Sequence, residues 1–157
     1  GHSERRKLFN ETDEIVAKKA QSLIRAQITP VICVGESLAE RESGRASDVI
    51  EKSVKTIVDS CTSSVDQEII FAYEPLWAIG SGKSASLNDI EEIHQLIRNL
   101  LRNNLSSKAE KMRILYGGSV SPENIKDISA VSDVDGVLVN CASGRLKQRS
   151  CCAAMGQ

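Results

Sequence analysis

Short apolar runs alternate with amphipathic stretches along the chain. Four runs are continuous and rich in β-branched or aromatic residues, as in strands buried on both faces; they cover residues 29–36, 68–75, 112–116 and 136–139. Apolar positions at helical spacing precede each of them, within residues 15–24, 49–61, 90–101 and 125–128. The pattern therefore predicts helix and strand in alternation, four times over. Repeated βα units imply parallel strands joined by right-handed crossovers.

Three serines are expected to cap these helices. Ser47 precedes the second amphipathic stretch, and Ser86 precedes the third with Asp89 three residues further on. Ser121 is followed by Pro122, a proline in the first turn of the fourth helix. Serine oxygens at these positions satisfy backbone N–H groups that a helix start leaves without partners.

The pattern leaves two α/β folds open, a doubly wound sheet and a (β/α)8 barrel. No Gly-x-Gly-x-x-Gly follows any predicted strand, which weakens the dinucleotide-binding version. Unusual residues cluster where the strands end: Glu36, Glu74, Gly117–Ser119 and Asn140–Cys141. Both folds place their sites at the carboxyl ends of strands, so these residues predict a site without deciding the fold.

Composition excludes several classes of function. With 20 basic and 21 acidic residues and a net charge of -1, the chain has no electrostatic basis for binding nucleic acid or an anionic membrane. Five aromatic residues offer no platform for stacking bases. No apolar stretch approaches the about 20 residues of a membrane span, and no secretory signal is visible at the start. We expect one domain over residues 1–157.

Cysteine and histidine limit the chemistry further. The five cysteines form neither a Cys-x-x-Cys pair nor an even framework, which favours a reducing, cytoplasmic location. The two histidines, His2 and His94, cannot build a multi-histidine metal site. His94 lies inside a helical stripe and is interpreted as having no catalytic duty. His2 belongs to a charged group of residues at the start of the chain, and such groups are usually solvated.

The segment from Tyr73 to Lys83 carries the strongest chemical signal. Glu74 ends a buried strand, where desolvation makes a carboxylate a better general base. Gly80 and Gly82 offer bare backbone N–H groups and the freedom of a loop that could close over an anion. The alternative is a solvated carboxylate followed by an ordinary turn.

The segment from Tyr116 to Val120 is a second candidate. Its two glycines let the backbone approach a ligand, and successive N–H groups favour phosphate. Taken alone, this segment is better interpreted as a plain turn between strand and helix.

Together and in this order, these motifs resemble the triosephosphate isomerase family. The resemblance rests on residues 1–6, 10–13, 33–36, 74–82 and 116–120, and it covers the chain from Gly1 to about Ser143. It implies a (β/α)8 TIM barrel, present here only as its C-terminal half of about four βα units. A complete barrel needs about 250 residues, and the chain has 157.

The resemblance implies an isomerase that interconverts dihydroxyacetone phosphate and D-glyceraldehyde 3-phosphate through an enediolate, in glycolysis and gluconeogenesis. Glu74 would be the base and neutral His2 the electrophile, with the loop from Pro75 to about Ala85 as a lid. Backbone N–H groups of Gly80 and Ser119 would hold the phosphate. No metal or organic cofactor is implied. The family is homodimeric, with much of its interface upstream of Gly1.

The chain departs from the family pattern at three places. Asn140 and Cys141 stand at substrate-binding positions where the family has a Gly-Gly pair, and they bring side chains where the family presents bare backbone. Residues 144–157 lack the family's final amphipathic stripe, and we interpret them as an atypical tail from an altered reading frame or a damaged 3′ end. The family's catalytic lysine and its neighbouring asparagine belong to a strand that would precede Gly1.

Two other functions stay open. One is a catalytically inactive fragment that binds phosphate or associates with the other half of a barrel. The second is a phosphosugar enzyme of another reaction class, which the specific Glu74 segment disfavours.

Overall fold

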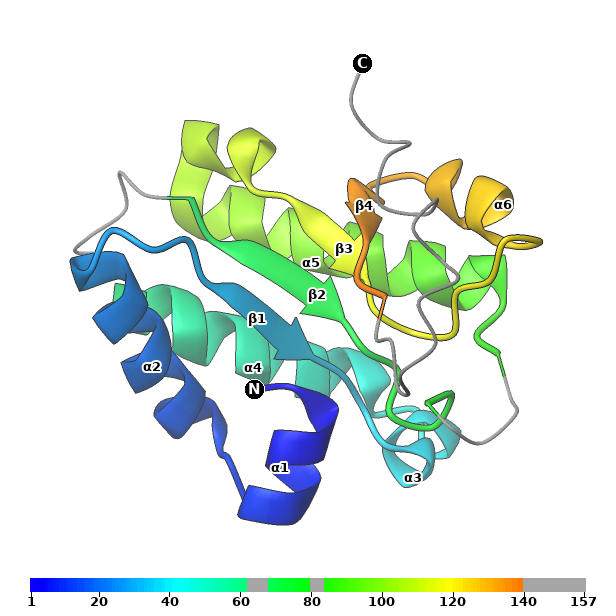
Figure 1. The fold of residues 1–157 in the computed structure, drawn as a ribbon, viewed down its shortest axis with the longest axis horizontal. Coiled ribbons are helices and arrows are strands. Elements are labelled where there is room, and N and C mark those ends of the chain that lie inside the picture. The colour runs from blue at the N-terminus through cyan, green and yellow to red at the C-terminus, as the bar shows by residue number, and fades with distance from the viewer. Residues whose placement is uncertain (62–67, 80–83, 140–157) are drawn as a thin grey trace.

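Four parallel strands form one sheet in the order β1-β2-β3-β4 (Figure 1). The computed structural model describes residues 1–61, 68–79 and 84–139. The strands are β1 (Val31–Val34), β2 (Ile70–Tyr73), β3 (Ile114–Tyr116) and β4 (Gly136–Val137). All three strand pairings are parallel. The predicted α/β class and parallel strands are therefore confirmed, although each strand is shorter than its apolar run.

The four predicted helices are present and three short ones accompany them. The predicted ones are α2 (Asp13–Arg25), α4 (Ala46–Cys61), α5 (Leu87–Leu105) and α6 (Ile125–Ser129). The additional ones are α1 (Ser3–Phe9), α3 (Leu38–Glu42) and the 3-10 helix η2 (Ser106–Lys111). These three are too short to show a helical stripe in the sequence.

One predicted cap is confirmed and two helix starts differ. Ser86 and Asp89 exchange hydrogen bonds at the start of α5 as predicted. Ser47 is not a cap, because α4 begins one residue earlier, at Ala46. The last helix begins at Ile125, since the side chain of Asn124 accepts the N–H of Ser121 and holds the preceding residues in a turn.

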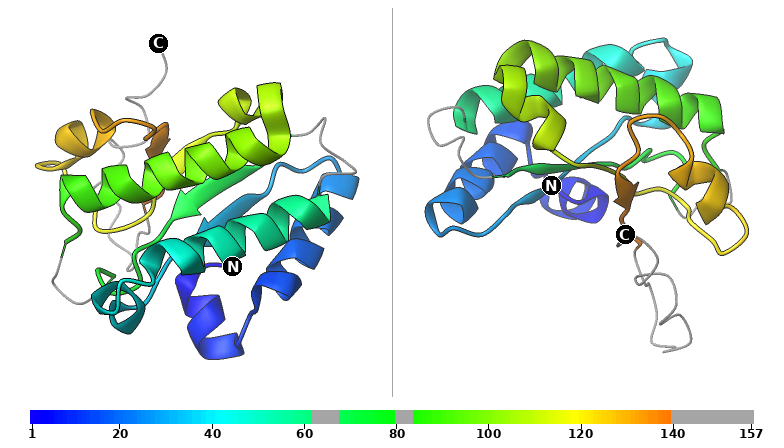
Figure 2. Two further views of the ribbon diagram at one scale, coloured as in Figure 1. Left: turned by 180° about the vertical axis from the view of Figure 1, so that it is seen from behind. Right: turned by 90° about the horizontal axis from the view of Figure 1, so that it is seen from above.

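Helices α4 and α5 cover the same face of the sheet (Figure 2). Consecutive strands are also neighbours in the sheet. The described chain therefore winds in one direction, because in a doubly wound sheet the strand order reverses and helices cover both faces. Successive βα units of a (β/α)8 barrel wind in the same way.

Alternate residues of the strands build the core against these helices. Ile32 pairs with Phe71, and Phe71 pairs with Ile114. The core cluster takes the same face of every strand, because side chains alternate between the faces of a sheet. Its members from the first three strands are Ile32, Val34, Phe71, Tyr73, Ile114 and Tyr116.

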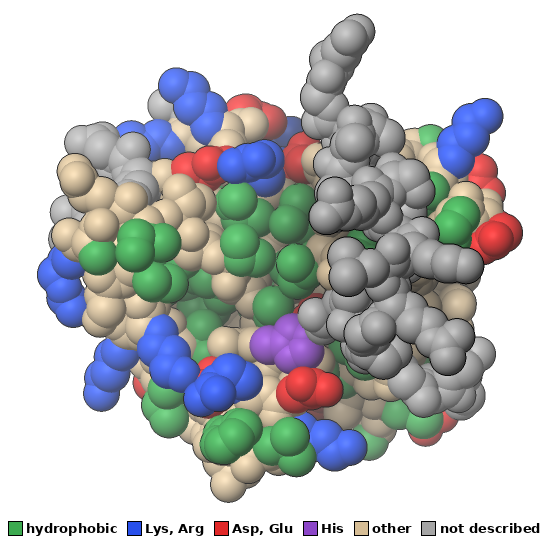
Figure 3. Space-filling model, in the orientation of Figure 1, with side chains coloured by type: hydrophobic (Ala, Val, Ile, Leu, Met, Phe, Trp, Pro, Cys, Tyr) green, Lys and Arg blue, Asp and Glu red, His purple; other side chains and the backbone are tan. Residues whose placement is uncertain are grey.

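The opposite face of the sheet is apolar as well. Val31 lies on it with 47% of its surface exposed, whereas Cys33, Ile70 and Ala72 on the same face are buried, and Figure 3 shows hydrophobic side chains in the middle of this face. It is the face that a closed barrel would turn inward, so the half-barrel stays a prediction that this face supports.

Candidate active site

Glu74 follows β2 directly and is almost fully buried, with 1% of its surface exposed. Its N–H donates to the carbonyl oxygen of Val34 over 2.8 Å, which continues the β1–β2 ladder by one residue. Glycines flank it on both sides. A Cβ on Gly35 would overlap the Glu74 carbonyl oxygen, and a Cβ on Gly117 would lie 2.9 Å from its Cγ. The two glycines therefore leave the space that the Glu74 backbone and side chain occupy.

The carboxylate of Glu74 meets the start of α1. Its Oε2 accepts a hydrogen bond from the backbone N–H of Ser3 over 2.9 Å. Its Oε1 lies 3.1 Å from Nε2 of His2, the residue that precedes α1. Nδ1 of His2 accepts a hydrogen bond from the N–H of Glu4. The proton of a neutral His2 ring is therefore on Nε2, the nitrogen that faces Glu74.

Arg6 fixes α1 against the sheet. Its Nη2 donates to the carbonyl oxygen of Cys33 in β1, and its Nη1 donates to Asp13 over 2.7 Å. Its Nε donates to the carbonyl oxygen of Gly1 over 3.0 Å. One side chain thus joins the residue before His2 to β1 and α2, which places the imidazole over the carboxyl end of the sheet.

Cys33 is the thiol of this site. Burial, and then the neighbouring negative charge of Glu74, raise the pKa of Cys33 to about 12. Cys33 therefore stays protonated at neutral pH. Because the thiolate is the reactive form of cysteine, this thiol is not a reactive group of the site. The site therefore offers a carboxylate and an imidazole as its reactive groups.

The second oxygen of Glu74 defines what the site can do. Oε1 is buried and makes no well-aligned hydrogen bond within the described residues, and the group that faces it is His2 Nε2 at 3.1 Å. A buried carboxylate oxygen without a well-aligned donor is costly and marks a functional group. It can accept a proton from a bound molecule, while the adjacent imidazole N–H can donate to an oxygen of the same molecule.

Ser119 lies after β3, on the far side of Glu74 from His2 along the sheet. Its hydroxyl donates to the carbonyl oxygen of Ala78 over 3.2 Å. Ala78 is fully buried, four residues after Glu74. The turn after β3 thus contacts the segment that leaves Glu74. A Cβ on Gly118 would overlap the ring of Tyr116, so this turn needs glycine.

Three predicted binding residues, Gly80, Asn140 and Cys141, lie outside the described residues. The same holds for residues 80–83 of the predicted lid and for the tail at 144–157. Their assigned roles stay predictions.

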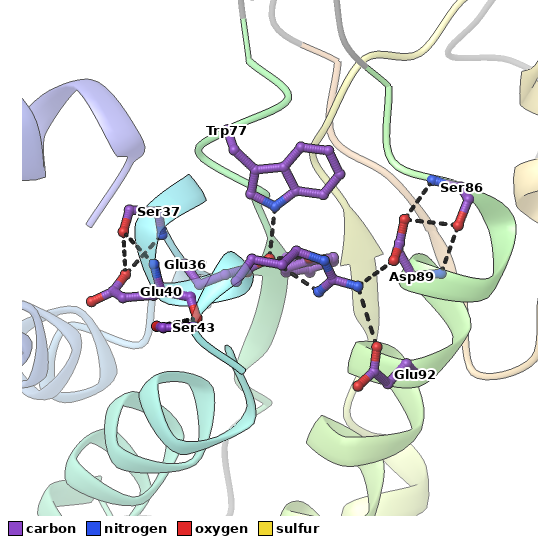
Figure 4. A network of polar contacts seen from close by, with 10 residues as sticks. Glu36, Ser37, Glu40, Ser43, Trp77, Ser86, Asp89 and Glu92 are labelled. Atoms are coloured by element: carbon purple, nitrogen blue, oxygen red, sulfur yellow. Dashed lines mark hydrogen bonds and ion pairs between the residues drawn. The ribbon is translucent and has the colours of Figure 1, made fainter. Parts of the chain in front are cut away.

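The sequence placed Glu36 at a strand end but did not reveal that its buried carboxylate supports the Glu74 segment. Glu36 is fully buried, and its Oε1 accepts hydrogen bonds from the Tyr73 hydroxyl over 3.0 Å and from Trp77 Nε1 over 2.8 Å. Figure 4 shows the Trp77 indole directed at Glu36. Its position at a strand end was noticed, but the partners come from 37 and 41 residues away. No local pattern could have revealed them.

The described residues show neither a metal-binding cluster nor a membrane-spanning helix. Within residues 1–61, 68–79 and 84–139, no three His, Cys, Asp or Glu side chains gather as a metal ion would require. In the same part of the chain, no helix combines the length and the apolar character needed to cross a membrane.

The fold and the site together define a class. A parallel βα sheet wound in one direction, with a carboxylate and an imidazole meeting at the carboxyl ends of its strands, is an α/β protein with an acid–base site. The chain belongs to the triosephosphate isomerase family, whose model matches residues 1–155. A curated triosephosphate isomerase from Endomicrobium trichonymphae is 48% identical over 143 residues. These residues are 91% of this chain and 57% of that protein, so the chain spans little more than half of it.

Proposed function

We propose that this chain supplies the proton-transfer groups of an isomerase acting on dihydroxyacetone phosphate and D-glyceraldehyde 3-phosphate. The observation that carries the proposal is the buried Glu74 Oε1, which makes no well-aligned hydrogen bond in the described residues and lies 3.1 Å from His2 Nε2. Family membership supports the same reaction.

In this reaction, Glu74 removes a proton from the carbon next to the substrate carbonyl, and the electron pair moves onto the carbonyl oxygen. The N–H at Nε2 of His2 donates to that oxygen and stabilises the enediolate. His2 gives its Nε2 proton to this oxygen and takes the hydroxyl proton from the oxygen of the first carbon. Glu74 then returns the abstracted proton to the second carbon, which converts ketose to aldose. The Ser3 N–H keeps Oε2 occupied, so Oε1 is the oxygen that moves the proton.

The phosphate site belongs to the proposal as well. Backbone N–H groups of Gly80 and Ser119 bind the phosphate, and Asn140 and Cys141 complete this site in place of two glycines. The contact of Ser119 with Ala78 supports it, because it brings the turn after β3 next to the segment that leads to Gly80. The chemistry needs no metal or organic cofactor, since the carboxylate moves the proton between the carbons and the imidazole moves the proton between the oxygens.

Membership of the family also suggests the pathway, the compartment and the oligomeric state. We place the activity in glycolysis and gluconeogenesis, in the cytoplasm, and in a homodimer. The chain contributes the C-terminal half of a (β/α)8 barrel, which the single winding direction and the open sheet face support.

Two observations favour a second function. Val31 is exposed on the face of the sheet opposite α4 and α5 (Figure 2), and the chain spans 57% of the Endomicrobium relative. A catalytically inactive chain that associates with a complementary half-barrel, or that only binds phosphate, is the alternative.

Turnover of glyceraldehyde 3-phosphate separates the two functions. The chain is assayed alone and after mixing with the part of the Endomicrobium relative that it does not match. A Glu74→Gln variant prepared in the same way reports any isomerase carried over from the expression host. The proposal expects turnover above this variant in at least one arm. Rates equal to the variant in both arms would reject it and leave the association function.

A further inference from the structure

Arg41 in α3 contacts three carboxylates from two separate parts of the chain. Its Nη1 lies 3.3 Å from Oε1 of Glu36, and its Nη2 bonds to Asp89 and lies 3.2 Å from Oε2 of Glu92. The guanidinium also lies over the Trp77 ring, 5.6 Å from the ring centroid. Only 18% of the Arg41 side chain is exposed. A shielded guanidinium with several acceptors holds its partners in fixed geometry.

On one side, Arg41 completes the partners of Glu36. The same Glu36 oxygen accepts from the Tyr73 hydroxyl and from Trp77 Nε1. Tyr73 immediately precedes Glu74, and Trp77 follows it by three residues. Arg41 therefore neutralises the buried carboxylate that holds the chain on both sides of Glu74. Without this cation, the fully buried Glu36 would have no counter-ion among the described residues.

On the other side, Arg41 holds the first turn of α5. Asp89 Oδ1 accepts from Arg41, while its Oδ2 accepts from the N–H and hydroxyl of Ser86. Figure 4 shows Trp77 and Asp89 as parts of one connected network of polar contacts. The chain leaves the sheet at Glu74, and α5 begins at Leu87. The Arg41 guanidinium thus connects the residues that follow Glu74 to the first turn of α5.

We propose that Arg41 is a positioning residue that couples the first turn of α5 to Trp77 and so fixes the backbone that carries Glu74. The proposal concerns the site of the proposed isomerase and, in its effect on turnover, rests on that function. Arg41 acts through Glu36 and Asp89, and it has no contact with Glu74 itself among the described residues.

Trp77 reports on this coupling without any activity measurement, because it is the single tryptophan of the chain. In Arg41→Met, we expect its emission to shift to longer wavelength and its collisional quenching by acrylamide to rise about twofold, since an indole released from its acceptor becomes accessible to water. Arg41→Lys keeps the charge but cannot bond to two carboxylates at once, and we expect an intermediate rise. Arg102→Met, at the other end of α5 and paired with Glu110, is the matched control without effect.

A second variant pair tests the coupling itself. Asp89→Asn weakens the bond to Arg41, and we expect Trp77 quenching to rise although Asp89 and Trp77 share no described contact. Ser86→Ala removes the cap of α5 but leaves the Arg41–Asp89 pair, so Trp77 should stay as in the wild type. A folded Arg41→Lys or Asp89→Asn protein with wild-type emission and quenching would overturn the proposal, even if Arg41→Met failed to fold.

Turnover adds a readout that separates positioning from stability. In the arm in which the wild type is active, we expect Arg41→Lys to lower kcat about tenfold with little change in KM, because Arg41 does not contact the substrate. A raised KM with unchanged kcat would overturn the role in positioning Glu74. An inactive wild type would reject the proposed function, while the Trp77 measurements would still decide the coupling.

Discussion

Glu74 and Ser3 are joined by a hydrogen bond from a backbone N–H to a buried carboxylate oxygen, 2.9 Å long and spanning 71 residues of sequence. The bond comes from the first residue of α1, where N–H groups have no partner within the helix. It leaves the other Glu74 oxygen to face His2. The start of a short helix thus decides which oxygen of the carboxylate is available for chemistry.

Replacing Ser3 with proline tests this bond cleanly. Proline is favoured at the first position of a helix, and His2 has a ψ of 145°, which suits a residue before proline. The change removes the donor to Glu74 together with the Ser3 hydroxyl, and we expect the loss of the donor to lower the free energy of unfolding by urea by about 1.5–3 kcal/mol. Ser3→Ala is the control. It keeps the N–H and removes a buried hydroxyl without a partner in the described structure, and it should change stability by about 0.5 kcal/mol or less. Equal stability of both variants would contradict the assignment.

The sequence predicted the elements whose signal repeats over several turns or residues. Helices α2, α4 and α5 and all four strands appear where apolar spacing predicted them. The positions that face the core recur with the period of the helix or strand, so the apolar residues mark the element. The N-terminal group of charged residues was interpreted as a solvated end. Instead it forms α1, held by Arg6 to β1 and α2. Those bonds reach up to 27 residues along the chain, so local propensity could not reveal them.

The residues of the candidate site also differ in whether the local sequence could reveal them. Glu74 was predictable, because a carboxylate that ends a buried strand stands out in the apolar pattern. His2 was identified by resemblance alone, since a histidine next to Ser3 and Glu4 has no local signal of function. The positions of Glu36 and Arg41 relative to Trp77 depend on how α3 packs, and α3 spans five residues. Its capping box of Ser37 and Glu40 was the one local signal of a helix there.

Gly35 and Gly44 should respond very differently to alanine. A Cβ at Gly35 would overlap the carbonyl oxygen of Glu74, whereas a Cβ at Gly44 would meet open space. We expect Gly35→Ala to lower the free energy of unfolding by about 3 kcal/mol. Gly44 has a φ of +72°, so Gly44→Ala should cost only the backbone strain of about 1 kcal/mol. Urea unfolding of the two variants measures the difference, and a larger loss at Gly44 would refute the close packing beside Glu74.

Arg98 should be the most sensitive cation of the described core. Its side chain is 4% exposed and pairs with Asp133 and Asp135, and it also donates to the carbonyl oxygens of Ala109 and Met112. Arg98→Met would remove the cation that pairs with both carboxylates and one donor from each carbonyl oxygen, at a cost of about 3–5 kcal/mol.

The exposed pair of Arg113 and Glu68 is the matched control for Arg98. Its arginine side chain is 55% exposed, and such pairs contribute about 0.2–1 kcal/mol. Urea unfolding of Arg98→Met and Arg113→Met compares the two directly. A loss in Arg98→Met no larger than that in Arg113→Met would show that the buried guanidinium does not join α5 to η2 and to the segment before β4.

His94 should make the protein less stable in mild acid. It is fully buried, and its Nδ1 lies 3.0 Å from the carbonyl oxygen of Asp133. A carbonyl can only accept, so Nδ1 carries the proton of the neutral ring and Nε2 is left without a donor in the described structure. Burial lowers the pKa of His94 from its ordinary value of 6.5, with Asp133 and Asp135 opposing the shift and Arg98 adding to it.

Because the folded state takes up this proton less readily than the unfolded state, stability should be constant above pH 6.5 and fall as the pH drops below it, down to the folded pKa. The slope for one proton is at most about 1.4 kcal/mol per pH unit. His94→Asn keeps an N–H for Asp133 but does not titrate. It should lose ring packing against Tyr73 and Tyr116 at every pH and show a shallower decline between neutral pH and pH 5. Urea unfolding of both proteins across this range gives the two profiles, and parallel profiles would rule out His94 as the source of the acid sensitivity.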